Sequence, residues 1–148
     1  ASVKRLIECN KNQLIDLVLD IEKYPDFVPF CLDAHVYERK NEGDLILIIA
    51  DLTIGKGPFK DTYKSDVKFS KKDNTIKVTN IGGPLNHLEN IWHFKEQEKG
   101  TEISFDIDFE IENKFLNIVM TKSFQFGLDK IADAFQKRAE ELFGNSKN

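Results

Sequence analysis

The stretch TEISFDIDFEIE, residues 101–112, decides the fold of this chain. Apolar side chains occupy every second position along it, and the positions between them are acidic or carry a hydroxyl. The apolar set is Ile103, Phe105, Ile107, Phe109 and Ile111. Because successive side chains of a β-strand point to opposite faces, this pattern predicts a strand with one apolar and one acidic face. The apolar face should cover a core, and the acidic face should meet water.

Five other runs of period two precede this strand, and the first of them begins at Leu32. The segments between the runs are rich in turn-forming residues, and they are 41–43, 55–58, 71–74, 82–84 and 99–100. Connections this short favour antiparallel neighbours, because parallel strands need a crossover of about a dozen residues or more. The sequence therefore predicts a six-stranded antiparallel meander that ends with residues 101–112.

The period changes to that of a helix after the last strand, and it continues to the end of residues 114–143. The apolar stripe of this segment consists of Met120, Phe124, Leu128, Ile131, Phe135, Ala139 and Leu142. At a rise of 1.5 Å per residue, such a helix is about 45 Å long. Gly127 interrupts it, and we interpret this glycine either as a point of close packing against the sheet or as a bend.

The N-terminal part predicts a short strand over residues 2–9, followed by a helix. Asn10 suits the N-cap of that helix, and Gln13 suits its capping-box partner. The helix should end near residues 21–23, because Tyr24 precedes a proline and such residues avoid the α region.

This order of elements predicts an α+β fold with a helix-grip layout. A curved antiparallel sheet of about seven strands would surround the long C-terminal helix, because a sheet with one apolar face must cover that face. The length and the 41% hydrophobic content suit one domain over residues 1–148. A curved sheet that grips a helix leaves a gap between the two, so the layout also predicts a pocket.

The charge and the cysteine content bear on partners and on location. The net charge of −4 argues against DNA as a partner, although it leaves room for a local basic face. The longest apolar run, residues 45–50, is far shorter than the roughly 18 residues that a membrane span needs, and no signal peptide opens the chain. We interpret Cys9 and Cys31 as thiols in a reducing compartment. These features predict a cytoplasmic protein, and its expected contact with the membrane is peripheral, at the inner face of the membrane.

No motif of a catalytic or metal site occurs in the sequence. There is no HExxH, no paired CxxC, no GxSxG and no phosphate-binding glycine loop. Cys31 is the one candidate nucleophile, but no neighbour in sequence supplies a base, so we interpret it as a packing cysteine. The sequence thus predicts no catalytic residue, no metal and no cofactor, and it leaves the question of enzymatic activity open.

Lysines gather on one face of the strand predicted after the glycine-rich turn at 55–58. Lys60, Lys64 and Lys68 have the same parity, opposite to the aromatic face of that strand. A solvated strand face explains this row most simply. The alternative is a basic surface that meets anionic lipid or RNA.

Two motifs resemble signatures of the coenzyme Q-binding START-domain family. YPDFVPFC, residues 24–31, is similar to its Tyr-Pro-x-Phe-Leu-Pro-Trp-Cys signature. GPLNHLENIWHF, residues 83–94, is similar to its Gly-Pro-Phe…Leu…Trp-x-Phe segment. Residues 59–67 and 134–139 also fit, so the resemblance spans almost the whole chain. The departures are Val28 for leucine, Phe30 for tryptophan and Leu85 for phenylalanine.

The resemblance implies a START/Bet v 1-like fold, an apolar ligand cavity and three hypotheses for function. The first is non-enzymatic binding or chaperoning of ubiquinone or a related prenyl lipid, in support of respiration or quinone synthesis. The second is inhibition of ribosome assembly through the large subunit, as in the RatA branch of the family. The third is a polyketide cyclase or aromatase, for which Asp61, Tyr63 and Ser65 could supply a polar, titratable group.

The predicted ligand-binding residues are mostly aromatic and come from every part of the chain. They are Tyr24, Phe27, Pro29, Phe30, Cys31, Tyr63, Trp92, Phe94, Phe105, Phe109, Phe124 and Leu128. Trp92 and Phe94 share strand parity, so they should point inward together. Lys60, Lys64 and Lys68 are the predicted contact surface for an anionic membrane or for the large ribosomal subunit.

Overall fold

A computed structural model describes the backbone of residues 2–56, 58–82, 85–111 and 114–144. Within these ranges, it leaves the side chains of 56, 59, 82, 85–87, 109–111 and 114–126 undescribed. The elements are β1 (Ser2–Ile7), α1 (Lys11–Leu19), the 3-10 helix η1 (Ile21–Asp26), β2 (Cys31–Glu42), β3 (Leu45–Lys56), β4 (Phe59–Ser70), β5 (Thr75–Gly82), β6 (Leu85–Gln97), β7 (Gly100–Ile111) and α2 (Lys114–Phe143).

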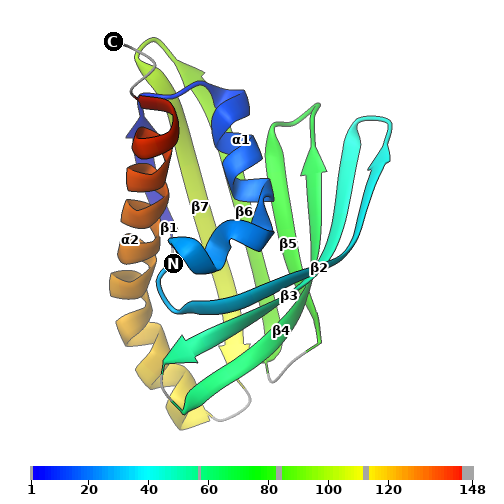
Figure 1. Ribbon diagram of the computed structural model, residues 1–148. Coiled ribbons are helices and arrows are strands. Elements are labelled where there is room, and N and C mark those ends of the chain that lie inside the picture. Colours follow the sequence, from blue (N-terminus) through cyan, green and yellow to red (C-terminus); the bar gives the residue numbers. More distant parts are fainter. Residues whose placement is uncertain (1, 57, 83–84, 112–113, 145–148) are drawn as a thin grey trace.

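The seven strands form one antiparallel sheet in the order β1-β7-β6-β5-β4-β3-β2. The sheet curves, and α2 runs along its concave side together with α1 and η1 (Figure 1). The predicted α+β helix-grip layout is therefore confirmed. Strand β1 pairs with the last strand of the meander, so the two ends of the chain's sheet-forming part lie side by side.

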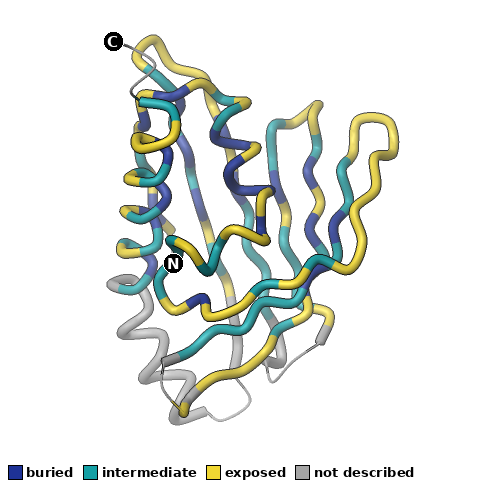
Figure 2. The backbone as a smooth tube through the Cα atoms, in the orientation of Figure 1, coloured by how far each residue is buried: buried dark blue, intermediate teal, exposed yellow. Residues whose placement is uncertain are grey.

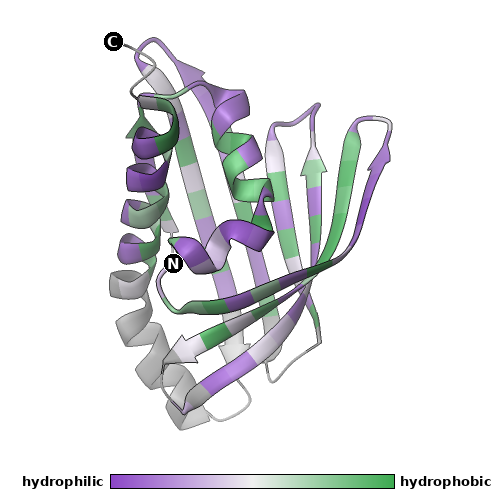
Figure 3. Cartoon of the chain, in the orientation of Figure 1, coloured by the Kyte–Doolittle hydropathy of each residue, from purple (hydrophilic) through white to green (hydrophobic). Residues whose placement is uncertain are grey.

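Strand β7 shows the alternation that the sequence predicts for residues 101–112. Ile103 and Phe105 are buried, whereas Asp106 and Asp108 are exposed. Figure 3 shows the same alternation of hydrophobic and hydrophilic residues along the neighbouring strands. The apolar face of the sheet meets α1 and α2 in a single core, whose buried residues Figure 2 places between the layers.

Helix α1 begins with the predicted capping box. The Asn10 side chain accepts a hydrogen bond from the Gln13 backbone N–H at 2.8 Å, and the Gln13 side chain accepts one from the Asn10 N–H at 3.2 Å. The helix ends at Leu19, earlier than the predicted 21–23, because Asp20 at ψ 64° has already left the helical region. The 3-10 helix η1 then continues the chain and contains Pro25.

Helix α2 has the predicted bounds, but near its C-terminus the residues that meet the core differ from the predicted apolar stripe. Leu128, Phe135 and Ala139 are buried as expected. Leu142 is 51% exposed, which corrects our prediction, and Phe143 packs against the core instead. Positions three and four residues after Ala139 both lie near its face of the helix, and the larger ring of Phe143 occupies the place against the core. The side chains of Met120 and Phe124 lie outside the described part.

Gly127 and Gly100 differ in whether their surroundings leave space for a side chain. A methyl group built at Gly127 meets no described atom within 4 Å, so close packing against the described residues does not explain that glycine, and the first of our two interpretations is wrong for this part of the structure. At Gly100 a methyl carbon would lie 2.2 Å from the backbone oxygen of Ile7, and φ is +151°. The close approach of β1 to the start of β7 therefore requires a glycine at position 100.

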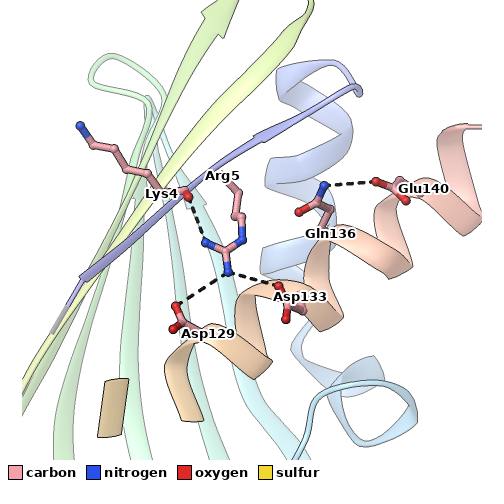
Figure 4. Close-up of polar contacts among 6 residues, drawn as sticks. All are labelled: Lys4, Arg5, Asp129, Asp133, Gln136 and Glu140. Atoms are coloured by element: carbon pink, nitrogen blue, oxygen red, sulfur yellow. Dashed lines mark hydrogen bonds and ion pairs between the residues drawn. The ribbon is translucent and has the colours of Figure 1, made fainter. Parts of the chain in front are cut away.

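An ion pair on the outer side of the molecule joins β1 to α2. The Arg5 guanidinium lies 3.2 Å from a carboxylate oxygen of Asp133 and 3.8 Å from one of Asp129 (Figure 4). One turn further along, the Gln136 amide donates to Glu140 at 3.3 Å. Because these groups are partly exposed to water, each pair contributes at most about 1 kcal/mol to stability.

Candidate ligand cavity between the sheet and helix α2

A cavity of about 310 Å³ lies between the concave face of the sheet and the helices. Aliphatic side chains form most of its wall, among them Leu52 on β3, Val78 on β5 and Leu88 on β6. Ile131 and Phe135 of α2 contribute the opposite side. The volume is at the lower end of the range of about 300–1,000 Å³ that is typical of small-molecule sites.

A second hollow of about 470 Å³ lies near the start of α1 and the β6–β7 turn. Its lining is mainly polar and charged, and Lys11 and Glu96 form an ion pair across it at 3.4 Å. This open groove lacks the apolar enclosure that small-molecule sites have. We therefore take the cavity beside α2 as the candidate site.

A cluster of aromatic rings connects the sheet, α2 and η1 beside the cavity. The Trp92 ring centroid lies 4.2 Å from that of Phe105 and 5.2 Å from that of Phe135. Phe135 also packs edge-to-face on Tyr24 at 5.5 Å and on Phe27 at 5.1 Å. Such contacts stabilise a pair by about 0.5–1.5 kcal/mol beyond burial. The cluster therefore holds η1 against α2 at the border of the cavity.

A hydrogen bond from the hydroxyl of Tyr24 links η1 to α1. The phenolic O–H donates a hydrogen bond to the backbone oxygen of Val18. Burial is the main cause that raises the pKa of Tyr24 far above its usual value, and the nearby Cys31 and Asp20 add to it. The hydroxyl therefore stays protonated and acts as a structural donor.

Cys31 lies at the start of β2 and lines the cavity. Its thiol points to the backbone oxygen of Asp33 at 3.7 Å, and burial raises its pKa to about 11. A thiol is a weak nucleophile until it loses its proton. This environment supports our interpretation of Cys31 as a packing cysteine.

The raised pKa predicts the pH dependence of Cys31 labelling in a Cys9→Ala variant, in which Cys31 is the sole thiol. Since the pKa of the folded thiol exceeds the ordinary thiol value of 9.0, the protonated thiol favours the fold below pH 9, and this contribution disappears as the pH rises toward 11. We expect iodoacetamide to label the native protein slowly at pH 7–8 and faster only near pH 11. Unfolded protein should follow an ordinary thiol titration. Rapid labelling of native protein at pH 7 would contradict this prediction.

Besides Tyr24 and Cys31, three polar side chains interrupt the apolar wall. Ser65 on β4 is 3% exposed, and Tyr63 on the same strand has a pKa that burial, followed by the charge of Asp61, raises. The Oδ1 atom of Asn90 on β6 is buried and has no hydrogen-bond partner among the described residues. Asp61 itself is exposed and does not line the cavity. The lining therefore offers hydrogen bonds, but no pair of titratable groups arranged for proton transfer among its described residues.

The structure places the predicted ligand-binding residues in four kinds of environment. The cavity is lined by Tyr24, Cys31, Tyr63, Trp92 and Phe105. The core, away from the cavity wall, contains Phe27, Phe94 and Leu128. Pro29 is half-buried, and Phe30 is 41% exposed at φ +68°. The side chains of Phe109 and Phe124 lie outside the described part of the chain.

Several lining residues were absent from the prediction. Leu88 and Asn90 share strand parity with Trp92, and this signal in the sequence could have identified both. Leu52 and Val78 lie on the inward faces of β3 and β5 and carried a similar but weaker signal. Ile131 was assigned to the helix stripe but not to the cavity.

The lysine row lies on the outer face of the sheet, as its parity predicts. Lys60, Lys64 and Lys68 are all exposed. The Nζ atom of Lys64 lies 5.1 Å from the centre of the Tyr37 ring, and Lys68 is opposite Lys77 of β5. The row therefore continues onto the next strand.

The fold and the cavity define a helix-grip protein with an internal apolar site. Residues 9–136 match the family described as "Polyketide cyclase / dehydrase and lipid transport", and the chain belongs to this family. Among the described residues, no helix is long and apolar enough to cross a membrane, and no group of side chains is arranged to hold a metal ion.

Two named relatives align with almost the whole chain. The "Ribosome association toxin RatA" of Rickettsia prowazekii is 30% identical over 141 residues, which cover 93% of this chain and 94% of the relative. The "Coenzyme Q-binding protein COQ10, mitochondrial" of Dictyostelium discoideum is 33% identical over 140 residues, which cover 93% of this chain and 67% of the relative.

Solved structures share the fold at low sequence identity. A START superfamily protein from Mycobacterium smegmatis superposes with a TM-score of 0.81 at 18% identity, covering 96% of this chain and 97% of that one. The Zhui aromatase/cyclase of Streptomyces sp. R1128 superposes with a TM-score of 0.76 at 10% identity, covering 95% and 92%. These likenesses show the fold alone.

Proposed function

We propose that this protein binds ubiquinone or a related prenyl lipid in the cavity beside α2 and carries it without transforming it. The apolar wall of the cavity is the observation that supports this proposal most directly. The relative named as a coenzyme Q-binding protein supports the choice of ligand. In this role the protein would work in the cytoplasm, peripherally at the inner face of the membrane, and it would support respiration or quinone synthesis.

The affinity would come mainly from burial of the ligand's apolar surface. Each 100 Å² of lipid surface removed from water contributes about 2.5 kcal/mol. The aromatic faces of Trp92 and Phe105 suit a flat ring, because aromatic pairs stack with centroids about 4.5–7 Å apart. A cavity of about 310 Å³ suits a ring with the first part of a tail.

Ubiquinone-2, which has a tail of two isoprene units, tests the proposal by titration. Trp92 is the single tryptophan of the chain and lines the cavity, so bound quinone should quench its fluorescence. The matched control is the tailless ring 2,3-dimethoxy-5-methyl-benzoquinone, which should bind at least about tenfold more weakly because it buries less apolar surface. Equal binding of the two compounds, or no binding of either, would contradict the carrier function.

A second candidate function is binding to the large ribosomal subunit. The exposed lysine row on β4 and the 30% identity to a relative named as a ribosome association toxin favour it. Contacts of lysines with RNA phosphates are strongly salt-dependent. The cyclase hypothesis has less support, because Asp61 is exposed and leaves Tyr63 and Ser65 as its candidate polar groups.

A triple variant, Lys60→Glu, Lys64→Glu and Lys68→Glu, separates the first two functions. Under the carrier function it should lose co-sedimentation with anionic liposomes at low salt, since each lysine contributes about 1 kcal/mol near such a surface. It should keep its affinity for ubiquinone-2, because the three side chains point away from the cavity. If the wild type sediments with large ribosomal subunits but not with liposomes, and the variant loses this sedimentation, ribosome binding becomes the favoured function.

A further inference from the structure

Phe30 is the third residue of a tight turn that leads into β2, where the backbone favours a different residue. The backbone N–H of Cys31 donates to the oxygen of Val28 at 3.3 Å and closes the turn. Pro29 is at the second position, and Phe30 at the third has a φ of +68°. These are the features of a type II turn, whose third position is normally glycine or asparagine because a positive φ is costly for other side chains. The Gly55 N–H donates to the Phe30 oxygen at 2.9 Å and ties the turn to the end of β3.

Burial of the Phe30 ring does not offset this cost. The side chain is 41% exposed, it does not line the cavity, and it is not among the described residues that pack against the core. An asparagine would keep the turn and remove the exposed apolar surface. Backbone strain that the fold itself does not need gathers at functional sites. The ring at this position therefore indicates contact with something outside the chain.

Leu32 presents a second apolar side chain beside Phe30. It is 48% exposed, and the pairing of β2 with β3 skips it at a β-bulge. Bulges redirect side chains and are frequent at sheet edges, and β2 is an edge strand of this sheet. The buried Cys31 lies between the two exposed residues at the start of β2 (Figure 2). A single exposed apolar residue is ordinary, but here two separate backbone irregularities turn neighbouring apolar side chains outward. We call Phe30 and Leu32 the apolar pair.

The apolar pair borders one end of the cavity. Val28 and Cys31, on either side of Phe30 in the sequence, both line the cavity. Ile54 of β3, which pairs with Cys31, lines it too. The apolar pair therefore lies where the wall of the ligand site reaches the surface of the molecule.

Positive charge lies on the neighbouring strands. The residue of β3 that is hydrogen-bonded to Phe30 pairs with Lys60 of β4, and Lys60 and Lys64 are both exposed. The exposed carboxylates of Asp26 and Asp33 offset part of this charge. Apolar side chains next to lysines suit an anionic bilayer, because its interior takes up the apolar groups and its headgroups attract the lysines.

We propose that the apolar pair inserts into an anionic phospholipid bilayer and places this end of the cavity against the membrane that supplies the lipid. This inference rests on the proposed function, because a prenyl lipid with an apolar tail is held in bilayers and has to be collected there. The hydrogen bonds of the turn fix the Phe30 backbone before contact, which lowers the ordering cost of insertion. The lysines of β4 attract the protein to the surface, and the apolar pair holds it there.

The two parts of this surface respond differently to salt. In about 1 M salt the Debye length is about 3 Å, so the attraction of exposed lysines for anionic headgroups is screened. Apolar insertion does not depend on charge and persists. The wild type should therefore keep part of its affinity for vesicles at this ionic strength.

The test is flotation with vesicles of phosphatidylcholine and phosphatidylglycerol, at low salt and at about 1 M salt. Phe30→Asn and Leu32→Thr should each bind about tenfold more weakly than wild type under both conditions, because each removes an apolar side chain from the bilayer. Phe30→Asn should melt at or above the wild-type temperature, because asparagine tolerates a positive φ. Both variants should bind ubiquinone-2 as wild type does in calorimetric titration, since neither side chain lines the cavity.

Leu142→Gln is the matched control. Leu142 is 51% exposed, and its neighbour Phe143 lines the hollow beside the β6–β7 turn, at the opposite end of the sheet from the start of β2. This variant should bind the vesicles as wild type does. An equal loss in Leu142→Gln would show that the apolar pair is not the site of insertion.

The outcomes separate this inference from the function on which it rests. Wild-type vesicle binding by Phe30→Asn and Leu32→Thr would overturn the insertion. A lower melting temperature of Phe30→Asn would also overturn it, because the ring would then have a packing role. Binding of ubiquinone-2 by a wild type that ignores vesicles would overturn the insertion and leave the carrier function standing. Vesicle binding without ubiquinone-2 binding would overturn the carrier function alone. If the variants instead lose co-sedimentation with large ribosomal subunits, the apolar pair contacts the ribosome and not a bilayer.

Discussion

Replacing Phe135 by alanine is expected to destabilise the protein by about 4 kcal/mol, within the range of about 3–5 kcal/mol measured for buried phenylalanines. Phe135 is buried on α2, and its ring contacts Tyr24 and Phe27 as well as Trp92. The variant would lose the burial of its ring and three aromatic contacts at once. Because these contacts join α2 to η1 and to β6, the helix should separate from the sheet at lower temperature.

Thermal melting and chemical unfolding measure this effect. For a domain of about 150 residues, a loss of 4 kcal/mol lowers the melting temperature by roughly 10 °C. The matched control is Leu142→Ala on the same helix, which should change stability by less than about 0.5 kcal/mol because Leu142 is exposed. Equal melting temperatures for the two variants would contradict the role of Phe135 as the link between α2 and the rest of the core.

The contrast between Phe135 and Leu142 also shows which part of the fold was predictable. The bounds of α2 follow from a change of period that has no competing signal, and strand β7 (Gly100–Ile111) follows from strict alternation. The capping box of α1 was predictable for a similar reason, because Asn10 and Gln13 interact across a single turn. Such local patterns are sufficient where the structure depends on neighbours in sequence.

The candidate site was less predictable, because strand parity gives a side chain's face but not its depth. Phe94 and Trp92 have the same parity and are both buried, yet Phe94 packs in the core and Trp92 lines the cavity. The curvature of the sheet decides between these two positions, since only part of the concave face reaches the helices. Curvature depends on all seven strands together, so no short motif encodes it.

The prediction of the lining residues was also incomplete because it considered aromatic side chains and not polar ones. The emphasis on aromatic residues included Phe30, which is exposed immediately before β2, and omitted Asn90, which lies on the cavity wall. Aromatic content indicates an apolar lining, but specificity in small-molecule sites comes from a few polar groups. A search for polar residues of inward parity would have been the better guide to the atoms that select a ligand.

Replacing Trp92 by alanine is expected to remove most of the affinity for ubiquinone-2. Trp92 is 6% exposed, it lines the cavity and its ring packs on Phe105 and Phe135. The substitution would delete the largest flat surface of the wall and enlarge the cavity, so a bound ring would lose contacts on one side. We expect a decrease in affinity of at least about tenfold, and a decrease in stability of about 3 kcal/mol, at the low end for large aromatic residues because one side of Trp92 borders the cavity.

Phe94→Ala is the control that separates binding from stability. Phe94 lies two residues further along the same strand, on the same face, and it is buried but does not line the cavity. The Phe94→Ala substitution should therefore lower the free energy of unfolding by about 4 kcal/mol and leave the affinity for ubiquinone-2 nearly unchanged. Calorimetry measures both affinities, because Trp92→Ala removes the fluorescent probe. If Trp92→Ala binds ubiquinone-2 as tightly as wild type, or if Phe94→Ala loses affinity to the same extent, the cavity beside α2 is not where this protein holds its ligand.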